Sequence, residues 1–219
     1  MDFFAKYDPA KSPKGENVKL VRISPTDWES NTYLLVQDDQ ALLFDAGVAP
    51  DKIADALNRE NATLRAVLLT HGHFDHILSV DRLREKYAVP VFVHEADAPL
   101  LANGLKNASC LFFGKGISRK PADRLLHDGE KIPFGNREIT VLHTPGHTSG
   151  SVCYLFDDRL VSGDTLFANG CGRTDLPGGN ADAMDQSLAM LSHLPQTLTV
   201  CPGHGSRASL EEALASLGV

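Results

Sequence analysis

The sequence predicts a mixed α/β protein with two β-sheets, each covered by helices. Apolar runs typical of strands alternate with helical patterns, and these elements form two groups along the 219 residues. A sheet and a helix each bury one apolar face, so two such groups favour two sheets packed face to face with helices outside. With 42% hydrophobic residues and no Pro- or Ser-rich linker, the chain is expected to form a single domain over residues 1–219.

The first group of elements follows a polar segment, residues 1–16, which we interpret as an N-terminal arm. Asp38-Asp39 suits a hairpin turn between two strands, and Pro50 suits the start of a helix. Strands are expected at residues 18–23, 32–36, 41–44, 66–69 and 89–93, and helices at residues 50–60, 77–87 and 96–102.

The second group repeats the strand pattern, with turns at Asp128-Gly129, Gly135-Asn136 and Asp157-Asp158. Ser209 and Glu212 have the spacing of a capping box at the start of the last helix. Strands are expected at residues 124–126, 131–133, 139–143, 152–156, 159–162 and 198–201, and helices at residues 182–192 and 209–217.

Residues 103–123 form a long segment without a clear helical or strand period. Loops of this length are often functional. Phe112 and Phe113 stand here among basic residues that include Lys115 and Arg119, so we interpret the segment as a flap that faces a substrate. The alternative is an ordinary surface loop with a buried pair of phenylalanines.

Composition argues against several classes of function. The formal charge of −7 disfavours a nucleic-acid surface, which needs clustered Lys and Arg. No stretch approaches the roughly 20 apolar residues that span a bilayer, and the charged N-terminus does not resemble a signal peptide. The four widely spaced cysteines are read as reduced thiols, so we expect a cytoplasmic protein.

The segment Thr70–His76, with the sequence THGHFDH, predicts a metal site. It follows an apolar strand, where alternate side chains point the same way, so His71 and His73 can reach one point. The chain then turns into a helix, which directs Asp75 and His76 elsewhere. Imidazole and carboxylate donors of this kind suit zinc, iron or manganese.

Three later residues are suited to complete such a site. His147, Asp164 and His204 each follow a predicted strand and stand next to glycine, which permits close approach of the backbone. Functional residues often occupy such loops on a rigid scaffold. His143 is interpreted as a supporting or structural residue rather than a ligand.

Four motifs, in this order, resemble the metallo-β-lactamase fold superfamily: T-H-x-H-x-D-H, T-P-G-H-T-x-G, S-G-D-T-L-F and C-P-G-H-G. The likeness spans residues 18–205 and is greatest to the glyoxalase II group. It implies a four-layer αββα sandwich with two mixed sheets and a two-metal site. It also implies that Asp45 supports a ligand histidine, that Asp164 bridges both metals, and that the separate ligands are His71, His73 and His147 for one ion and Asp75, His76 and His204 for the other.

This resemblance implies a metal-dependent hydrolase that cleaves a hydroxyacyl thioester of a small thiol. Two divalent ions, zinc first and iron or manganese as alternatives, would supply a bridging hydroxide, with Asp75 and Asp164 as the catalytic carboxylates. The stretch G-C-G-R-T-D at residues 170–175 also resembles the persulfide dioxygenase branch. In that alternative, His71, His147 and Asp164 hold one iron. A third interpretation is a metal-stabilised scaffold without catalysis.

The expected substrate contacts depart from the glyoxalase II pattern. The chain ends 15 residues after His204, so we expect no helical C-terminal domain of the kind that binds glutathione carboxylates. Arg173, Lys115 and Arg119 are the candidates for holding a substrate carboxylate instead. Asp164 argues against antibiotic hydrolysis, because the commonest metallo-β-lactamases have cysteine at that position.

Overall fold

A computed structural model describes residues 18–26 and 29–218. The predicted N-terminal arm, residues 1–16, lies outside the described residues. The chain divides into two compact units, one spanning Gly15–Leu126 and one that contains His127–Val219. We call them the N-terminal and C-terminal units and describe each by itself; the single domain over residues 1–219 remains a prediction.

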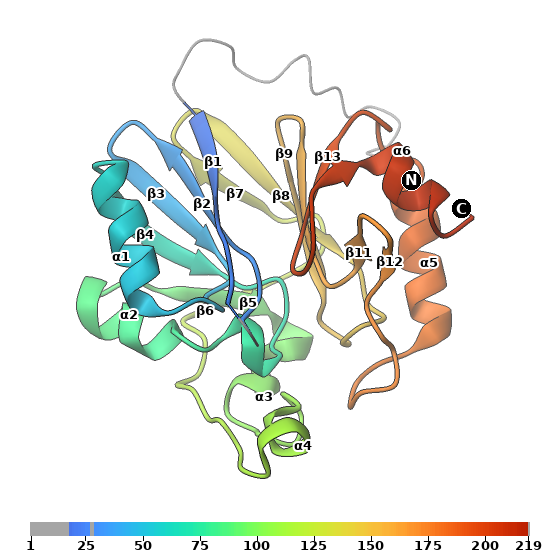
Figure 1. The fold of residues 1–219 in the computed structure, drawn as a ribbon, viewed down its shortest axis with the longest axis horizontal. Helices are drawn as coiled ribbons and strands as arrows, with labels where there is room; N and C mark the ends of the chain where they lie inside the picture. Colours follow the sequence, from blue (N-terminus) through green and yellow to red (C-terminus); the bar gives the residue numbers. More distant parts are fainter. Residues whose placement is uncertain (1–17, 27–28, 219) are drawn as a thin grey trace. The chain divides into compact units, whose positions relative to one another are not determined.

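The N-terminal unit is built on a six-stranded mixed sheet in the order β1-β2-β3-β4-β5-β6 (Figure 1). Strands β1 to β3 are antiparallel, and β3 to β6 run parallel to one another. The strands are β1 (Val18–Ile23), β2 (Thr32–Gln37), β3 (Gln40–Phe44), β4 (Thr63–Leu68), β5 (Val91–His94) and β6 (Arg124–Leu126). The helices are α1 (Pro50–Arg59), α2 (Val80–Tyr87), α3 (Ala98–Leu101) and α4 (Ser109–Phe113), with 3-10 turns η3 (Phe74–His76) and η4 (Glu95–Asp97).

Helices α1 and α2 bury their apolar faces against this sheet. Ile53 and Leu57 of α1 and Leu83 of α2 join one core with strand residues such as Leu34 and Val67. Pro50 stands at the first position of α1, where its missing N–H costs no helical hydrogen bond. The spacing of apolar residues predicted in the sequence therefore does produce the helix that covers the sheet.

The C-terminal unit contains a second six-stranded mixed sheet, in the order β14-β13-β10-β9-β8-β7. All neighbouring pairs are antiparallel except β10 and β13, which are parallel. Its strands are β7 (Lys131–Phe134), β8 (Arg137–His143), β9 (Val152–Phe156), β10 (Arg159–Gly163), β13 (Thr199–Pro202) and β14 (Ala208–Ser209), with a separate small pair β11 (Leu166–Phe167) and β12 (Gly170–Cys171). Helices α5 (Ala181–Leu191) and α6 (Leu210–Ala215) pack on this sheet in a second core.

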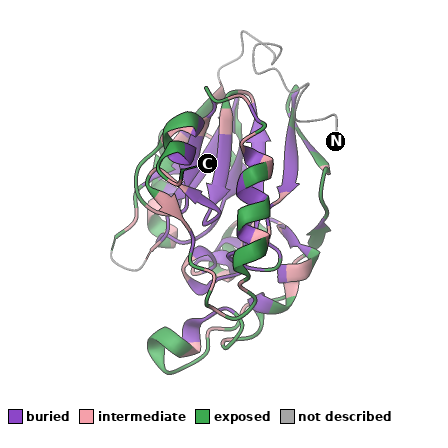
Figure 2. Ribbon diagram, turned by 90° about the vertical axis from the view of Figure 1, so that its right-hand side faces the viewer, coloured by how far each residue is buried: buried purple, intermediate pink, exposed green. Residues whose placement is uncertain are grey.

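Burial follows the expected pattern within each unit. Figure 2 shows purple, buried strands, while the helices carry green, exposed residues. Strands β2 and β9 are buried at every position, which agrees with the continuous apolar run of β9 and the apolar centre of β2. The predicted capping box is present, with Ser209 and Glu212 bonded to each other's backbone N–H.

The fold class is confirmed as mixed α/β with two large mixed sheets, and three details of the prediction are corrected. Strand Arg124–Leu126 pairs with β5 in the first sheet and not with the second group of strands. The segment of residues 103–123 contains a five-residue helix, α4, which is too short to show a period in sequence. The helix expected from residue 77 begins at Val80, because η3 and a turn come first.

No helix within residues 18–26 and 29–218 combines the length and apolar character needed to cross a bilayer.

Candidate metal centre

The first set of candidate ligands lies in the N-terminal unit, directly after β4. His73 has an extended backbone, and the chain then enters η3 with Asp75 and His76. The ring of His71 lies 4.9 Å from that of His73 and 4.1 Å from that of His76, measured between centroids. All three rings are buried, and Nε2 of His76 lies 3.7 Å from Oδ2 of Asp75. One loop thus gathers three imidazoles and a carboxylate. The sequence predicted that His76 would diverge from the first two histidines, but its ring lies nearer to His71 than the ring of His73 does.

Asp45 lies beneath this loop and accepts three hydrogen bonds. Its carboxylate is buried at the end of β3 and receives the backbone N–H and the hydroxyl of Thr70, both at 2.8 Å. It also receives Nδ1 of His76 at 2.8 Å. Asp45 has a φ of +59°, a conformation that Asp and Asn tolerate better than most residues. The position predicted for a supporting carboxylate does bond a histidine of the ligand loop.

These contacts fix which nitrogen of each ring is available for a cation. A carboxylate only accepts, so Nδ1 of His76 carries the proton. The Thr70 hydroxyl donates to Asp45, so its oxygen accepts the Nδ1 proton of His71, 3.1 Å away. Both rings therefore turn the lone pair of Nε2 outward, which is the usual arrangement of histidines bound to metals. Within the described chain, no hydrogen bond reaches the buried Nε2 atoms of His71, His73 and His76.

Asp97 is a further residue that supports the loop, and no pattern in the sequence predicted this role. Its fully buried carboxylate accepts the backbone N–H of Gly72, at 2.8 Å, between His71 and His73. A Cβ atom at Gly72 would lie 2.6 Å from the Cβ of Leu100, so glycine allows the loop to pack closely. Asp97 was not predicted because its contact joins segments about 25 residues apart.

The second set of candidate ligands lies in the C-terminal unit, on three loops that follow β8, β10 and β13. Because β10 and β13 are parallel neighbours, their carboxyl ends meet at one edge of the sheet. A hydrogen bond from Gly203 N to Gly163 O, at 2.8 Å, links the two loops there. Asp164 and His204, which follow these glycines, are thereby brought together.

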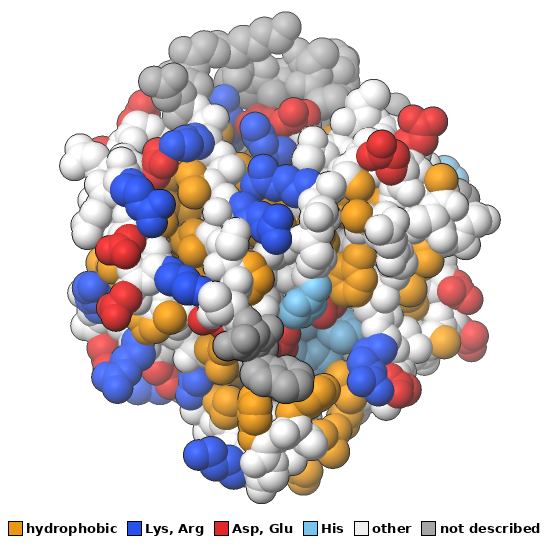
Figure 3. Space-filling model, viewed as in Figure 1, with side chains coloured by type: hydrophobic (Ala, Val, Ile, Leu, Met, Phe, Trp, Pro, Cys, Tyr) orange, Lys and Arg blue, Asp and Glu red, His pale blue; other side chains and the backbone are white. Residues whose placement is uncertain are grey.

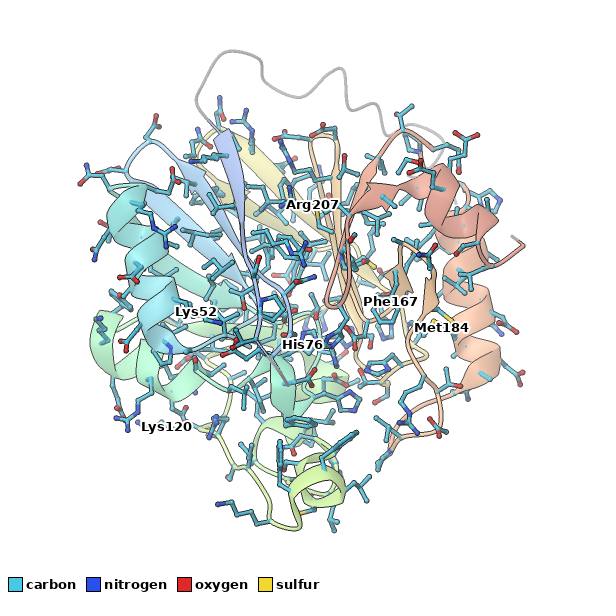
Figure 4. The ribbon with its side chains drawn as sticks, viewed as in Figure 1. Lys52, His76, Lys120, Phe167, Met184 and Arg207 are labelled. Atoms are coloured by element: carbon cyan, nitrogen blue, oxygen red, sulfur yellow. The ribbon has the colours of Figure 1, made fainter. Side chains whose placement is uncertain are left out.

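Asp164 lies between two histidines of this set. Its Oδ2 atom is 3.6 Å from Nε2 of His147 and 3.5 Å from Nε2 of His204. His147 and Asp164 are buried, whereas the His204 side chain is 41% exposed. The edge of its ring faces Phe167 of β11, which Figure 4 labels, with 6.2 Å between centroids. One oxygen of Asp164, Oδ2, therefore lies close to both histidines.

The segment after β12 orients His147. The Arg173 carbonyl accepts the Nδ1 proton of His147 at 2.7 Å, so Nε2 again carries the lone pair. A Cβ atom at Gly172 would lie 2.0 Å from the backbone oxygen of Asp164 and 2.9 Å from Nδ1 of His147. Gly172 therefore permits the close approach of two ligand loops. This role of the 170–175 stretch was missed, because it depends on main-chain atoms.

The side chain of Arg173 lies away from this bond. Its guanidinium binds both carboxylate oxygens of Asp175, at 2.6 and 2.7 Å, on the exposed surface. Arg173 lowers the pKa of Asp175 to about 2, and Asp175 raises the pKa of Arg173. Both groups are therefore charged at neutral pH, and any anion that binds Arg173 must compete with Asp175.

The other predicted substrate contacts lie on residues 103–123 of the N-terminal unit. Phe112 and Phe113 are exposed, which contradicts the alternative of a buried phenylalanine pair. Arg119 donates to the carbonyls of Ile77 and Leu78 at 2.9 and 2.8 Å, and burial lowers its pKa. Its guanidinium thus anchors the chain just after His76. Lys115 is exposed near the tip of the segment.

His143 has a structural contact, as predicted. Its Nε2 atom lies 2.9 Å from the carbonyl oxygen of Ser149, across the loop that carries His147. The hydroxyls of Thr144 and Thr165 bond each other at 2.9 Å and tie the base of that loop to the segment after Asp164. These contacts hold the second ligand set in place.

The donors of both sets fit divalent metal ions. The nitrogen–oxygen separations of 3.5 to 3.7 Å within the sets exceed those of good hydrogen bonds. Two ligands that each lie about 2.0–2.1 Å from one ion in a tetrahedral site are separated by roughly 3.3 Å. Imidazole nitrogens oriented through Nδ1, together with carboxylates, are the donor types that zinc and iron accept.

Known proteins are similar to this chain in sequence and in fold. Residues 25–204 match the Metallo-beta-lactamase superfamily. The "Probable metallo-hydrolase YqgX" of Bacillus subtilis is 41% identical over 180 residues, which cover 81% of this chain and 85% of the relative.

Two solved structures are also similar. The BLEG-1 B3 metallo-beta-lactamase is 36% identical with a TM-score of 0.83, covering 89% of this chain and 95% of its own. TTHA1623 in a di-iron-bound form is 34% identical with a TM-score of 0.77, covering 89% and 96%. This chain therefore belongs to the metallo-beta-lactamase superfamily.

Proposed function

We propose that this protein is a metal-dependent hydrolase, and specifically a thioesterase that cleaves hydroxyacyl thioesters of a small thiol. The observation that carries the proposal is the orientation of the donors. Asp45 accepts the Nδ1 proton of His76, and the Arg173 carbonyl accepts that of His147. The Thr70 hydroxyl, which donates to Asp45, accepts the Nδ1 proton of His71. In all three rings Nε2 therefore points outward. The name of the Bacillus relative, a probable metallo-hydrolase, supports the same class of reaction.

In this proposal the two ligand sets serve one pair of cations. The superfamily resemblance assigns His71, His73 and His147 to one ion and Asp75, His76 and His204 to the other, with Asp164 between them. Asp164 Oδ2 faces His147 and His204, one ligand of each ion, which supports a bridging role. The di-iron form of TTHA1623 is a relative that holds two metals. Zinc is our first choice for this chain, because thiolate leaving groups and imidazole ligands both suit it.

The bound ions would lower the pKa of a water molecule and polarise the thioester carbonyl. The protein supplies the orientation for this chemistry. Asp75, partly exposed beside His76, would accept a hydrogen bond from the attacking hydroxide and aim its lone pair at the carbonyl carbon. Asp45 accepts the Nδ1 proton of His76 and keeps that ring in its ligand tautomer. Asp164 supplies negative charge that balances the cations.

The thiol part of the substrate is expected to carry carboxylates, as glutathione does. Lys115 and Arg173 are the proposed contacts, and both are exposed. Arg119 is a weaker candidate, because its guanidinium already bonds two carbonyls. Binding of a carboxylate at Arg173 requires Asp175 to release it, so Asp175→Ala should lower the KM for thioesters of acidic thiols.

The test combines metal analysis with thioester hydrolysis. Purified protein is reconstituted with zinc or iron, its metal content is measured, and thiol release from S-lactoylglutathione is followed. We expect two ions per chain and thiol release that chelation abolishes. Fully metallated protein that releases no thiol from any acyl thioester contradicts the proposal. A chromogenic β-lactam serves as the comparison substrate, since one relative is named a B3 metallo-beta-lactamase; faster β-lactam hydrolysis would replace the thioesterase by a lactamase.

The G-C-G-R-T-D stretch favours one other candidate, a mononuclear iron dioxygenase acting on persulfides. Gly172 and the Arg173 carbonyl of this stretch contact His147 and Asp164, two of its three proposed ligands. One iron per chain, together with oxygen consumption on glutathione persulfide and no thioester hydrolysis, would establish it in place of the hydrolase.

A further inference from the structure

The aromatic side chains beside the metal motif form one cluster in the N-terminal unit. Phe74 stands in sequence between the candidate ligands His73 and Asp75, and its ring is almost fully buried. The centroids of Phe112 and Phe113 lie 5.2 and 5.0 Å from that of Phe74. These separations are typical of packed aromatic rings. The two rings of α4 therefore rest directly on the segment that carries the ligands.

Hydrogen bonds hold this part of the chain to the motif at several points. The N–H of Phe74 donates to the Asn107 carbonyl at 3.0 Å. The buried Asn107 side chain donates to the carbonyls of Leu100 and Ile117 at 3.0 and 2.8 Å. Its oxygen accepts the Ser109 hydroxyl at 2.6 Å. Buried polar contacts therefore support the segment that carries α4.

The outer side of this surface is apolar and exposed. Phe112 is 44% and Phe113 is 42% exposed, and Leu105 and Leu111 of the same segment are also exposed. Figure 3 shows hydrophobic side chains gathered over the region of α3 and α4. A cluster of large exposed apolar residues on a soluble protein usually marks a binding surface. Its contact with Phe74 places this surface next to the ligand loop.

We propose that Phe112 and Phe113 form a specificity surface for the apolar group of the substrate, an alkyl or aryl acyl chain. This inference rests on the proposed thioesterase function and narrows its substrate class. Phe74 lies between the candidate ligands His73 and Asp75 in the sequence, and its ring is buried. The exposed rings of Phe112 and Phe113 pack against that ring. An acyl chain whose carbonyl meets the ligand loop can lie across Phe112 and Phe113 and remove their faces from water.

The experiment compares acetyl, butyryl, hexanoyl and benzoyl thioesters of glutathione on the zinc-reconstituted full chain. For the wild type, kcat/KM should rise along the alkyl series, by up to about fourfold for each added methylene group. The double variant Phe112→Ala/Phe113→Ala should lose most of this dependence on chain length, and the loss should appear in KM. Replacement of both residues by leucine should restore part of the dependence of kcat/KM on chain length.

Leu125→Ala is the matched control, since Leu125 is 46% exposed on β6 and belongs to a different segment. This variant should keep the wild-type dependence on chain length. Hydrolysis that proceeds with equal kcat/KM for all alkyl thioesters would overturn the specificity surface and leave the thioesterase intact.

A binding measurement separates the two proposals further. Titration calorimetry with S-methylglutathione and S-hexylglutathione, which cannot be hydrolysed, should show tighter binding of the hexyl compound only when Phe112 and Phe113 are present. If the hexyl compound binds more tightly in this way but the protein hydrolyses no thioester, the apolar surface is supported and the proposed thioesterase function is rejected. Equal binding of both compounds, with a dimer in light scattering that the double variant abolishes, would overturn the surface in favour of an interface between two chains.

Discussion

The two sets of candidate ligands are assembled in different ways. In the N-terminal unit, His71, His73, Asp75 and His76 come from one loop of six residues, and the three rings are buried. In the C-terminal unit, His147, Asp164 and His204 come from three loops, and the His204 side chain is partly exposed. The first set depends on local backbone geometry and on the buried carboxylates of Asp45 and Asp97. The second depends on the register of a sheet.

This difference determines which ligands a substitution should disturb in each set. A change beneath the first loop acts on several ligands at once, because Asp45 bonds His76 directly and reaches His71 through Thr70. A change in the second set acts on the junction between loops, where Gly172 allows close contact and the N–H of Gly203 bonds the Gly163 carbonyl. Four measurements, ordered by expected effect, test this comparison.

Asp164→Ala should have the largest effect. Its carboxylate oxygen faces both His147 and His204, so its removal takes away the proposed bridge and leaves two ligands without their shared partner. We expect loss of both metals or collapse of the pair, measured as metal content per chain after dialysis, and thioesterase activity reduced by more than about a hundredfold. His204→Ala is the control, because it should remove one ligand of one ion. Two tightly held metals in Asp164→Ala would refute the bridging role.

Asp45→Ala should be next in size. Three donors, from Thr70 and His76, lose their buried acceptor, at a cost of about 2–4 kcal/mol in the free energy of unfolding. Metal affinity should fall by roughly 10- to 100-fold, because the tautomer of His76 is no longer fixed.

Asp45→Asn serves as the control, because asparagine also accepts a positive φ. It should keep most of the stability and lose mainly metal affinity. Equal affinity in all three proteins, measured by chelator competition, would show that Asp45 is only a turn residue.

Gly172→Ala should have an intermediate effect confined to the C-terminal set. The added Cβ would meet the Asp164 backbone and the His147 ring, so the loops must separate, at about 1–3 kcal/mol. We expect weaker metal binding in titration, with smaller change for the adjacent control Cys171→Ala. Unchanged metal affinity would mean that the loops can relax without moving the ligands.

The smallest effect concerns alkaline pH and Cys153. Burial raises the pKa of this thiol to about 11, from 9.0, while hydrogen bonds from Thr144 and Thr165 oppose the shift. The folded state therefore keeps a proton that the unfolded chain has lost, so stability falls as pH rises from 9 through 11, by up to about 3 kcal/mol. Urea unfolding at several pH values should show this slope in the wild type and a shallower one in Cys153→Ala. Parallel slopes would remove Cys153 as the cause.

The sequence predicted most of the scaffold because its patterns are local. Turn residues such as Asp38 and Asp157 mark hairpins, and both adopt positive φ. The ligand loop was readable because its donors are contiguous, and Asp164 and His204 because each follows a strand beside glycine. Asp97 and the Arg173 carbonyl were missed because their partners lie far away in sequence. Arg119 was predicted to face a substrate, but its side chain meets backbone carbonyls, which no sequence pattern reveals.

The bond from the Thr70 hydroxyl to Asp45 also limits how this protein can change. One carboxyl group sets the protonation of two imidazoles, which in the proposed arrangement serve different ions. A substitution beneath the loop therefore cannot change the affinity for one ion alone, because it also alters a ligand of the other ion. A change of metal preference would therefore have to begin with a substitution of the more exposed His204. That donor can be exchanged without disturbing the support that Asp45 gives to the two histidines.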